Sequence, residues 1–191
     1  MKPLIRLVAL LIALSPLLQA CIPLVVGAGV GAGVMMADDR RSNAVILEDQ
    51  TIEVKAKNRF EEKYKDSIHA NVTSFNRYVL ITGQAPTEEI KLDLTAIVLE
   101  VENVRNVQNE VVVAGNASFT SRSSDTITTT SVKGRLTQNK EIGANHVKVV
   151  TENSTVFLMG LVTRAEAEAA SQTAATTSGV QRVVKVFEYT D

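Results

Sequence analysis

Side chains that support catalysis or metal binding are few in this chain of 191 residues. There are two histidines, His69 and His146, and one cysteine, Cys21. The many Ser and Thr residues lack His and Asp partners in any order recognised for nucleophilic catalysis, and acidic pairs such as Glu61-Glu62 are typical of a solvated helix surface. We therefore predict no catalytic residue, no metal site and no enzymatic activity.

The two histidines stand at equivalent positions of a duplicated pattern. Val79 to Gly83 matches Val156 to Gly160 at a spacing of 77 residues, and His69 matches His146 at the same spacing. A match over this length indicates tandem domains and not the short units of a solenoid. The duplicated position predicts a structural role for both histidines, with a ligand or catalytic role as the alternative.

The cysteine ends a segment typical of an export signal. Lys2 and Arg6 precede an apolar run that is too short to span a bilayer. The following Leu18-Gln19-Ala20-Cys21 resembles a bacterial lipobox, with Gln19 less usual at its position. The resemblance implies that residues 1–20 are removed and that Cys21 carries a thioether-linked diacylglycerol and an amide-linked acyl chain, expected to be palmitate. The alternative is an ordinary secretory signal with an incidental cysteine.

The residue after the cysteine and the charge balance bear on location and partners. Ile22 stands where an Asp would retain a lipoprotein at the inner membrane, which implies the outer membrane, facing the periplasm. Once Lys2 and Arg6 are removed, 18 basic and 21 acidic side chains give a net charge of -3. This balance does not favour a nucleic-acid partner. A single cysteine also excludes disulfides within the chain.

Residues 21–47 have the composition of a flexible tether. The run Gly27 to Gly33 superficially offers a dinucleotide-binding fingerprint. No strand precedes it and no capped helix follows, so we reject that interpretation. We expect Asp38 to Arg41 to mark the exit of the tether into water.

The first repeat, residues 48–114, predicts the order helix, hairpin, helix and strand. An apolar stripe at helical spacing opens it, with Glu53 and Lys57 as a predicted i,i+4 pair. A hairpin is expected around Asn76-Arg77 and a helix start at Pro86. The stripe consists of Ile52, Ala56 and Phe60, and the last strand is predicted over Val104 to Val113.

The second repeat, residues 123–191, follows a linker at 115–122 and predicts the same order. Ser123-Ser124-Asp125 offers capping groups for its first helix, and Thr128, Val132 and Leu136 form the inward stripe. A hairpin is expected around Asn153-Ser154, then a helix over Arg164 to Thr177 and a strand over Val180 to Tyr189. Because each repeat is small, we also expect the two to be in direct contact.

This order, with V-x-L-x-G in the hairpin and V-x-x-V after the second helix, resembles the BON domain of bacterial periplasmic and membrane proteins. A lipobox followed by two such domains resembles the dual-BON-domain lipoproteins of the outer membrane. The resemblance implies an α+β fold of two tandem αββαβ modules, each with two helices on a small mixed sheet. It also implies binding of anionic phospholipid, a role in envelope integrity and a place near the division site, with no cofactor.

Charge distinguishes the two repeats as membrane-binding candidates. The first repeat carries 12 acidic and 8 basic side chains, whereas the second carries 7 of each. Between Asp125 and Lys148 there are four basic and two acidic residues, which favours contact with an anionic surface. Ile127 lies off the inward stripe of its helix, among small and basic residues. The predicted phospholipid-contacting residues are Ile127, Thr130, Ser131, Lys133, Gly134 and Arg135.

Two alternatives accompany this hypothesis. Ile127 could instead pack against the other domain or the linker. In function, the alternative to phospholipid binding is a protein-interaction scaffold, in which the acidic first domain holds the outer-membrane protein assembly machinery or a cell-wall enzyme.

Overall fold

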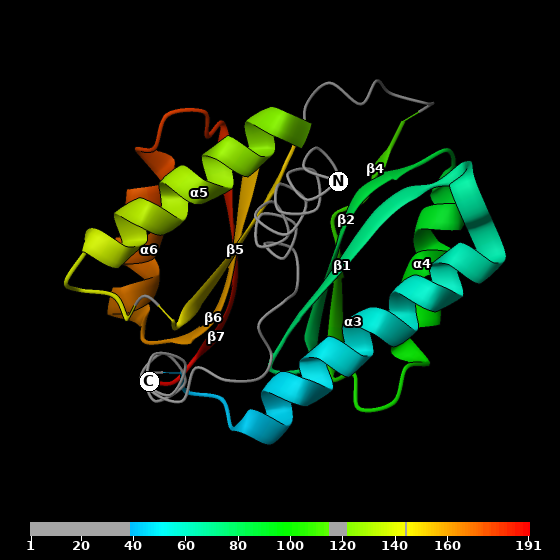
Figure 1. Ribbon diagram of the computed structural model, residues 1–191, viewed down its shortest axis with the longest axis horizontal. Helices are drawn as coiled ribbons and strands as arrows, with labels where there is room; N and C mark the ends of the chain where they lie inside the picture. Colours follow the sequence, from blue (N-terminus) through cyan, green and yellow to red (C-terminus); the bar gives the residue numbers. More distant parts are fainter. Residues whose placement is uncertain (1–38, 115–121, 144) are drawn as a thin grey trace, which may run out of the picture. The chain divides into compact units, whose positions relative to one another are not determined.

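The computed structural model describes residues 39–114, 122–143 and 145–191, and these form two modules with the same order of elements (Figure 1). The first module comprises α3 (Asn43–Tyr64), the short helix η2 (Lys65–Ser67), β1 (His69–Phe75), β2 (Tyr78–Ala85), α4 (Glu88–Leu99), β3 (Asn106–Asn109) and β4 (Val112–Val113). The second comprises α5 (Arg122–Gln138), β5 (Val147–Glu152), β6 (Thr155–Val162), α6 (Arg164–Ala175) and β7 (Arg182–Tyr189). The predicted αββαβ order is confirmed in both modules. Cys21, most of the predicted tether and residues 115–121 of the predicted linker lie outside the described residues.

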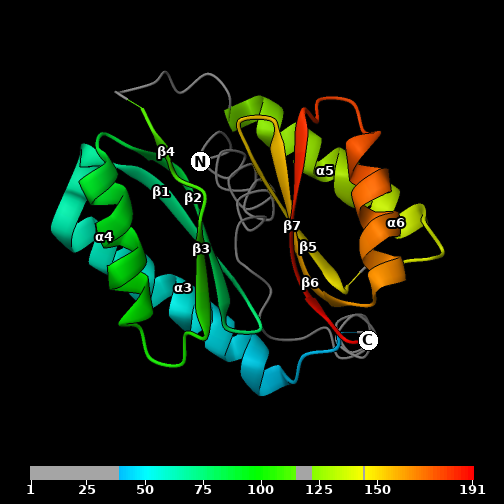
Figure 2. The same ribbon diagram turned by 180° about the vertical axis from the view of Figure 1, so that it is seen from behind.

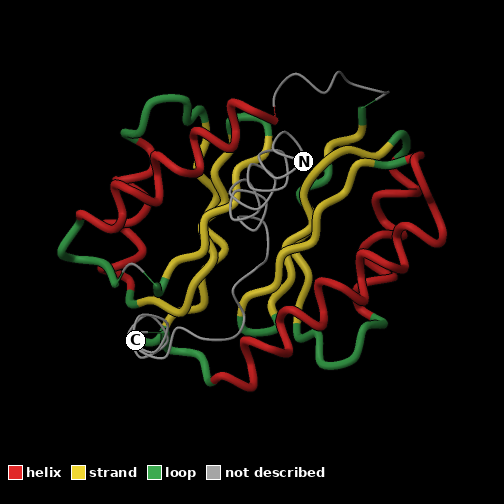
Figure 3. The backbone as a smooth tube through the Cα atoms, viewed as in Figure 1, coloured by secondary structure: helices red, strands yellow, loops and turns green. Residues whose placement is uncertain are grey.

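Each module has a small mixed sheet with a hairpin and one parallel neighbour. In the first, β1 pairs antiparallel with β2, and β3 and β4 pair parallel with β2; in the second, β5 and β7 flank β6 in the same way. A parallel neighbour requires a crossover connection, which α4 and α6 supply (Figure 2). The helices of each module lie on one face of its own sheet (Figure 3). In the ranges that the structure describes, no helix is both long and apolar enough to cross a membrane.

Both hairpins close through turns of two residues in the left-handed region. Asn76 and Arg77 have φ of 54° and 64°, and Asn153 and Ser154 have φ of 47° and 59°. Two successive positive φ angles are the signature of a type I′ turn, whose twist matches that of the flanking strands. The hairpins predicted around these residues are therefore confirmed.

Close backbone contact explains the glycine that ends each of the two matching segments, Val79 to Gly83 and Val156 to Gly160. A Cβ on Gly83 would lie 1.9 Å from the carbonyl oxygen of His69, and one on Gly160 would lie 2.3 Å from that of His146. Any side chain at these positions would push the first strand of the hairpin away.

Each module has its own hydrophobic core between its helices and sheet. The apolar residues of the predicted inward stripes are buried in these cores. They are Ile52, Ala56 and Phe60 in α3, and Val132 and Leu136 in α5. The alanine stripe of α6, Ala167, Ala170 and Ala174, is buried as predicted. Small side chains let this helix pack closely on the second sheet.

A third cluster joins the two modules through the other faces of their sheets. It contains the buried residues Phe75, Leu80, Phe157, Met159 and Val186. The middle strands therefore bury side chains on both faces, since β2 directs Val79 and Ile81 into its own core and Leu80 into the joint cluster. Direct contact between the modules, expected from their size, is confirmed.

The structure differs from the sequence-based expectations at two boundaries. Helix α3 begins at Asn43, capped by the Ser42 side chain, and so includes five residues assigned to the tether. The strand predicted over Val104 to Val113 is divided into β3 and β4, because Val111 N donates to the Asn109 side chain and Val111 itself is buried in the core. The pairing register with β2 is the same on both sides of this break, since Ile81 pairs with Asn109 and Gln84 pairs with Val112, and β7 of the second module has no such break.

Candidate functional site

The outward face of α5 carries an exposed apolar side chain among small, uncharged neighbours. Ile127 is 68% exposed, and no described residue covers it. Thr130, Ser131 and Gly134 are exposed on the same side of the helix, and a Cβ on Gly134 would have no atom within 4 Å. The candidate residues that helical spacing brings together are thus presented to solvent.

The orientation of this face follows from the residues on the opposite side of α5. Val132 and Leu136 are completely buried in the core of the second module, and Thr128 is nearly so. Thr129 Oγ1 donates to Thr151 Oγ1 of β5 at 2.7 Å, which fixes the rotation of the helix on the sheet. Residues one half-turn away, including Ile127, must then face outward.

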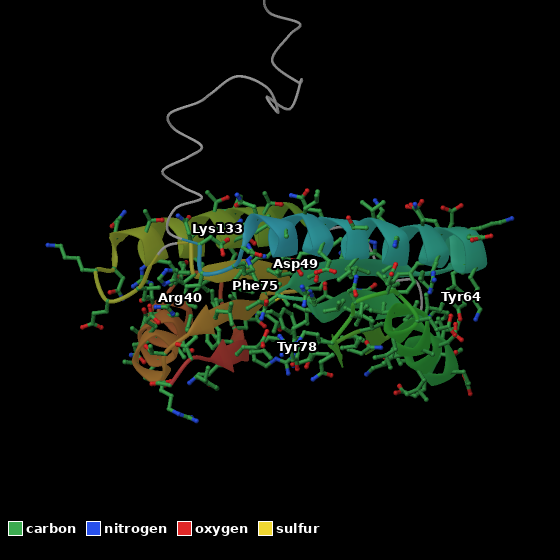
Figure 4. All side chains as sticks on the ribbon, turned by 90° about the horizontal axis from the view of Figure 1, so that it is seen from below. Arg40, Asp49, Tyr64, Phe75, Tyr78 and Lys133 are labelled. Carbon is green, nitrogen blue, oxygen red and sulfur yellow. The ribbon has the colours of Figure 1, made fainter. Side chains whose placement is uncertain are left out.

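The two candidate basic residues lie on opposite edges of this outward face. Lys133 is exposed at the surface of α5 (Figure 4). Arg135 points toward the C-terminal end of α6, where its guanidinium donates to Thr173 O, Thr177 Oγ1 and Thr176 Oγ1 at 2.8–3.1 Å. A cation at a helix C-terminus satisfies free carbonyls and opposes the helix dipole. Lys133 is therefore the better placed of the two for an external anion.

Lys148, counted among the basic residues that favour the second module, serves a different purpose. Its Nζ donates to Glu53 Oε1 at 2.8 Å and to Ser74 O at 3.2 Å, both in the first module. Glu53 was expected to pair with Lys57. The Lys57 Nζ instead lies 3.8 Å from Glu61 Oε1. The predicted i,i+4 pair is therefore wrong, because a partner from the other module is closer.

Two aspartates, one in each module, hold the hairpin turns. The Asp49 carboxylate accepts from Asn76 N and Arg77 N at 2.8 and 2.7 Å. Asp125 accepts from Asn153 N and Ser154 N at 2.8 and 2.9 Å. Asp125 was expected to cap its own helix, but α5 begins at Arg122 and the carboxylate caps the turn instead. The signal that would have identified this role is their equivalence at a spacing of 76 residues.

The residues before α3 bind both modules. Arg40 makes a bidentate ion pair with Glu166 at 2.8 and 3.0 Å and donates to Leu161 O. Arg41 pairs with Asp39 and Asp49 and lies 3.8 Å above the Phe75 ring. Figure 4 shows Arg40, Asp49 and Phe75 on the two sides of this junction. The segment expected to mark an exit into water is thus partly buried against the protein.

Glu166 is the residue of the second module that binds Arg40 at this junction. Burial alone would raise the pKa of its carboxyl, but hydrogen bonds from Arg40, Thr163 N and His146 outweigh burial and lower the pKa to about 2. His146 Nδ1 lies 3.1 Å from Glu166 Oε1. The histidine thus contacts an ion pair that ties the segment before α3 to α6, consistent with the structural role predicted for it.

The histidines and carboxylates of the described residues are dispersed over the two modules. Among residues 39–114, 122–143 and 145–191, no group of three or more His, Cys, Asp or Glu side chains is arranged to hold a metal ion. His69 and His146 belong to different modules and each lies in or next to the first strand of its hairpin. The face of α5 offers apolar, hydroxyl and ammonium groups, which suit a surface contact with a headgroup layer.

Comparison with known proteins adds independent findings. A family model described as the BON domain matches residues 48–115 and again residues 124–191. The chain is 38% identical over 193 residues to "Outer membrane lipoprotein DolP" of Haemophilus influenzae, covering 100% of this chain and 99% of that protein. It is 33% identical over 153 residues to a "21 kDa hemolysin" of Actinobacillus pleuropneumoniae, covering 79% of each.

Among solved structures, the chain is similar to CdsD, a structural protein of the type III secretion system of Chlamydia trachomatis. That match has 14% identity and a TM-score of 0.29, and covers 74% of this chain and 90% of the other. A structure of the CdsD C-terminal domain matches with 16% identity and a TM-score of 0.30, covering 75% and 67%. The two ranges matched by the family model coincide with the two modules of the structure.

Proposed function

Because this chain belongs to the BON-domain family and is a dual-BON lipoprotein of the outer membrane, we propose that it binds anionic phospholipid from the periplasmic side, through α5. It acts without catalysing a reaction and supports the integrity of the envelope, with a place at the division site. Acyl chains on Cys21 hold it at the membrane, and α5 recognises the headgroup layer.

The observation that carries this proposal is the exposure of Ile127 on a face without acidic residues. The exposed residues of α5 between Ser124 and Gln138 include Lys133 and Arg135 and no carboxylate. An isoleucine side chain gains about 1.5–3 kcal/mol on burial, and a lysine near an anionic surface gains about 1 kcal/mol. The sum, about 2.5–4 kcal/mol, corresponds to a Kd in the millimolar range.

Such a weak contact has a purpose when the protein already resides on the membrane. Three acyl chains make a nearly permanent anchor, so α5 need only find lipid at high effective concentration. The anchor then determines residence, while α5 determines orientation and preference for anionic regions of the bilayer. This division of labour supports a role in positioning the protein along the outer membrane.

The test compares two substitutions in the unacylated chain, residues 22–191. Ile127→Glu should lower cosedimentation with phosphatidylglycerol vesicles at least about tenfold, since it removes the apolar contact and adds a repelled charge. Leu92→Glu is the matched control, because Leu92 is 63% exposed on α4 of the first module. It adds the same charge away from α5. Equal binding by the Ile127→Glu and Leu92→Glu proteins would refute the proposal.

The protein-interaction scaffold remains a second proposal because of one feature of α4. Leu92 and Leu99 are exposed one above the other on this helix, with Glu88 and Glu89 exposed in its first turn. An apolar stripe beside carboxylates suits a protein partner with an apolar and basic surface better than an anionic membrane. Such a partner would belong to the outer-membrane protein assembly machinery or be a cell-wall enzyme.

A further inference from the structure

The first half of α3 has an outward face without any charge. Its exposed residues from the start of the helix to Val54 are Asn43, Ala44, Leu47, Gln50, Thr51 and Val54. Leu47 is 65% exposed and Val54 is 58% exposed. They stand seven residues apart, two helical turns along the same side, with Thr51 between them. This is an apolar stripe on a surface helix, and no described residue covers it.

The absence of charge on this face is notable because the same stretch contains three acidic residues. All three are turned inward or sideways and are paired with a basic residue of another segment. The pairs are Glu48 with Arg77, Asp49 with Arg41, and Glu53 with Lys148. These three carboxylates therefore add no unpaired negative charge to this face.

The position of the face within the repeat matches that of the α5 face. At the spacing of 76 residues, Thr51 corresponds to Ile127 and Val54 corresponds to Thr130. In both modules this side of the first helix lies opposite the stripe that packs on the sheet. The two first helices therefore present the same side of the fold to solvent, with exposed apolar groups at neighbouring turns.

Charge and chain length indicate which partner this face suits. The stripe on α4 is equally apolar, yet the exposed Glu88 and Glu89 beside it oppose an anionic surface. The α3 stripe has no such carboxylate, so contact with a headgroup layer would bury no charge. It also lies in the first described helix after the predicted anchor at Cys21, and the 18 residue steps from Cys21 to Asp39 allow at most about 65 Å between these two residues.

We propose, on the basis of the phospholipid-binding function above, that residues 43–54 of α3 form a second membrane contact, in which Leu47 and Val54 enter the boundary between headgroups and acyl chains. This contact is apolar, whereas the α5 contact includes Lys133 and depends on charge. High salt should therefore weaken the contact of α5 and leave that of α3 largely unchanged.

The experiment uses the full-length acylated protein in phosphatidylglycerol vesicles whose acyl chains carry bromine as a fluorescence quencher. Single cysteines replace Leu47, Val54, Ile127 or Leu92, and each is labelled with an environment-sensitive dye. The thiol of Cys21 is blocked by its own lipid. Leu92 is the matched control, since it is as exposed as Leu47 and belongs to the same module.

Dyes at Leu47 and Val54 should be quenched at least about twofold more than the dye at Leu92, because a side chain in this boundary lies about 5–10 Å deep. The difference should persist at high salt. Quenching at Leu47 and Val54 that equals that at Leu92 would overturn the inference, and is the result expected if a protein covers this face.

The dye at Ile127 separates this inference from the proposed function. If Ile127 is quenched and Leu47 and Val54 are not, the α5 contact stands and the α3 contact is refuted. If Ile127 is not quenched, the function proposed for α5 fails, whatever α3 does. Labels at two positions on α3 make the result independent of a local disturbance at one of them. The thermal unfolding midpoint of each labelled protein shows whether it is folded.

Discussion

Asp49 and Asp125 show how one carboxylate sets the geometry of a module. Each projects from the first helix and accepts two backbone N–H groups of the hairpin turn, whose residues have positive φ. These hydrogen bonds to a charged acceptor stabilise the left-handed turn, each by about 1.5–3 kcal/mol at most because the turns are only partly buried. The carboxylate thus joins helix, turn and sheet, and holds the outward face of the helix in place.

Glu166 provides a prediction about pH at the residue scale. Its folded-state pKa of about 2 lies below the ordinary value of 4.5. The resulting stabilisation, up to about 3 kcal/mol, is complete above the unfolded-state pKa and is lost as the pH falls through the folded-state value. Glu166→Gln should therefore lower the free energy of unfolding near neutral pH, with a gap to the wild type that closes between about pH 5 and pH 2.

Urea unfolding across this pH range measures that gap. Glu168→Gln is the control, because Glu168 lies on the same helix and its side chain is 73% exposed. A gap for Glu166→Gln that stays constant from neutral pH to pH 3 would contradict the predicted role of the Arg40 ion pair.

Residues whose roles could be predicted from the sequence are positioned by their neighbours along the chain. Residues whose roles were missed make contacts with distant parts of the chain. Ile127 could be placed off the inward stripe because helical spacing is local, whereas its exposure of 68% could not be predicted, because contact with the other domain was equally compatible with the sequence. Arg40, Glu166 and Lys148 could not be assigned, because each has its partner in the other module or across more than 90 residues. Local charge patterns then gave the wrong partner for Glu53.

At the scale of elements, hydrophobic periodicity and turn chemistry account for most of the fold. The alternating strands and the Asn-containing turns predict both hairpins, and the helix caps at Thr87 and Thr163 agree with the predicted helix starts. The division of the last strand of the first module could not be predicted, since it depends on Asn109 bonding α4 through Lys91 O and Thr95 Oγ1. The early start of α3 follows from the Ser42 side chain, which accepts from Val45 N and caps the helix.

Helix α5 allows a prediction that separates binding from stability. Lys133→Gln should weaken binding to anionic vesicles about fivefold and reduce its salt dependence, with little effect on unfolding. Arg135→Gln should instead lower the free energy of unfolding by about 1–2 kcal/mol, because it removes the hydrogen bonds to the end of α6.

Vesicle cosedimentation and urea unfolding of the two variants give both quantities. The assignment would be wrong if Arg135→Gln unfolded like the wild type and lost as much vesicle affinity as Lys133→Gln. Arg135 would then be a lipid contact and not a cap of α6.

At the scale of the whole molecule, the described residues join two small cores through a third. Hydrogen bonds between the modules lie beside the joint cluster of Phe75 and Phe157. In these, Glu188 accepts from Asn76 and Arg105 of the first module. Modules of about 70 residues are marginal alone, and shared burial stabilises both. The proposed lipid binding uses surfaces that this packing leaves exposed, chiefly the outward faces of α3 and α5.

The central claim is direct recognition of anionic phospholipid by the folded domains, apart from the acyl anchor. It is tested most directly by cosedimentation of the unacylated chain, residues 22–191, with phosphatidylglycerol and with phosphatidylcholine vesicles at low and high salt. We predict tighter binding to the anionic vesicles than to the neutral ones, with the difference reduced by salt as the contact of Lys133 is screened. Absence of binding to both vesicle types would leave Cys21 as the sole membrane contact and contradict the claim.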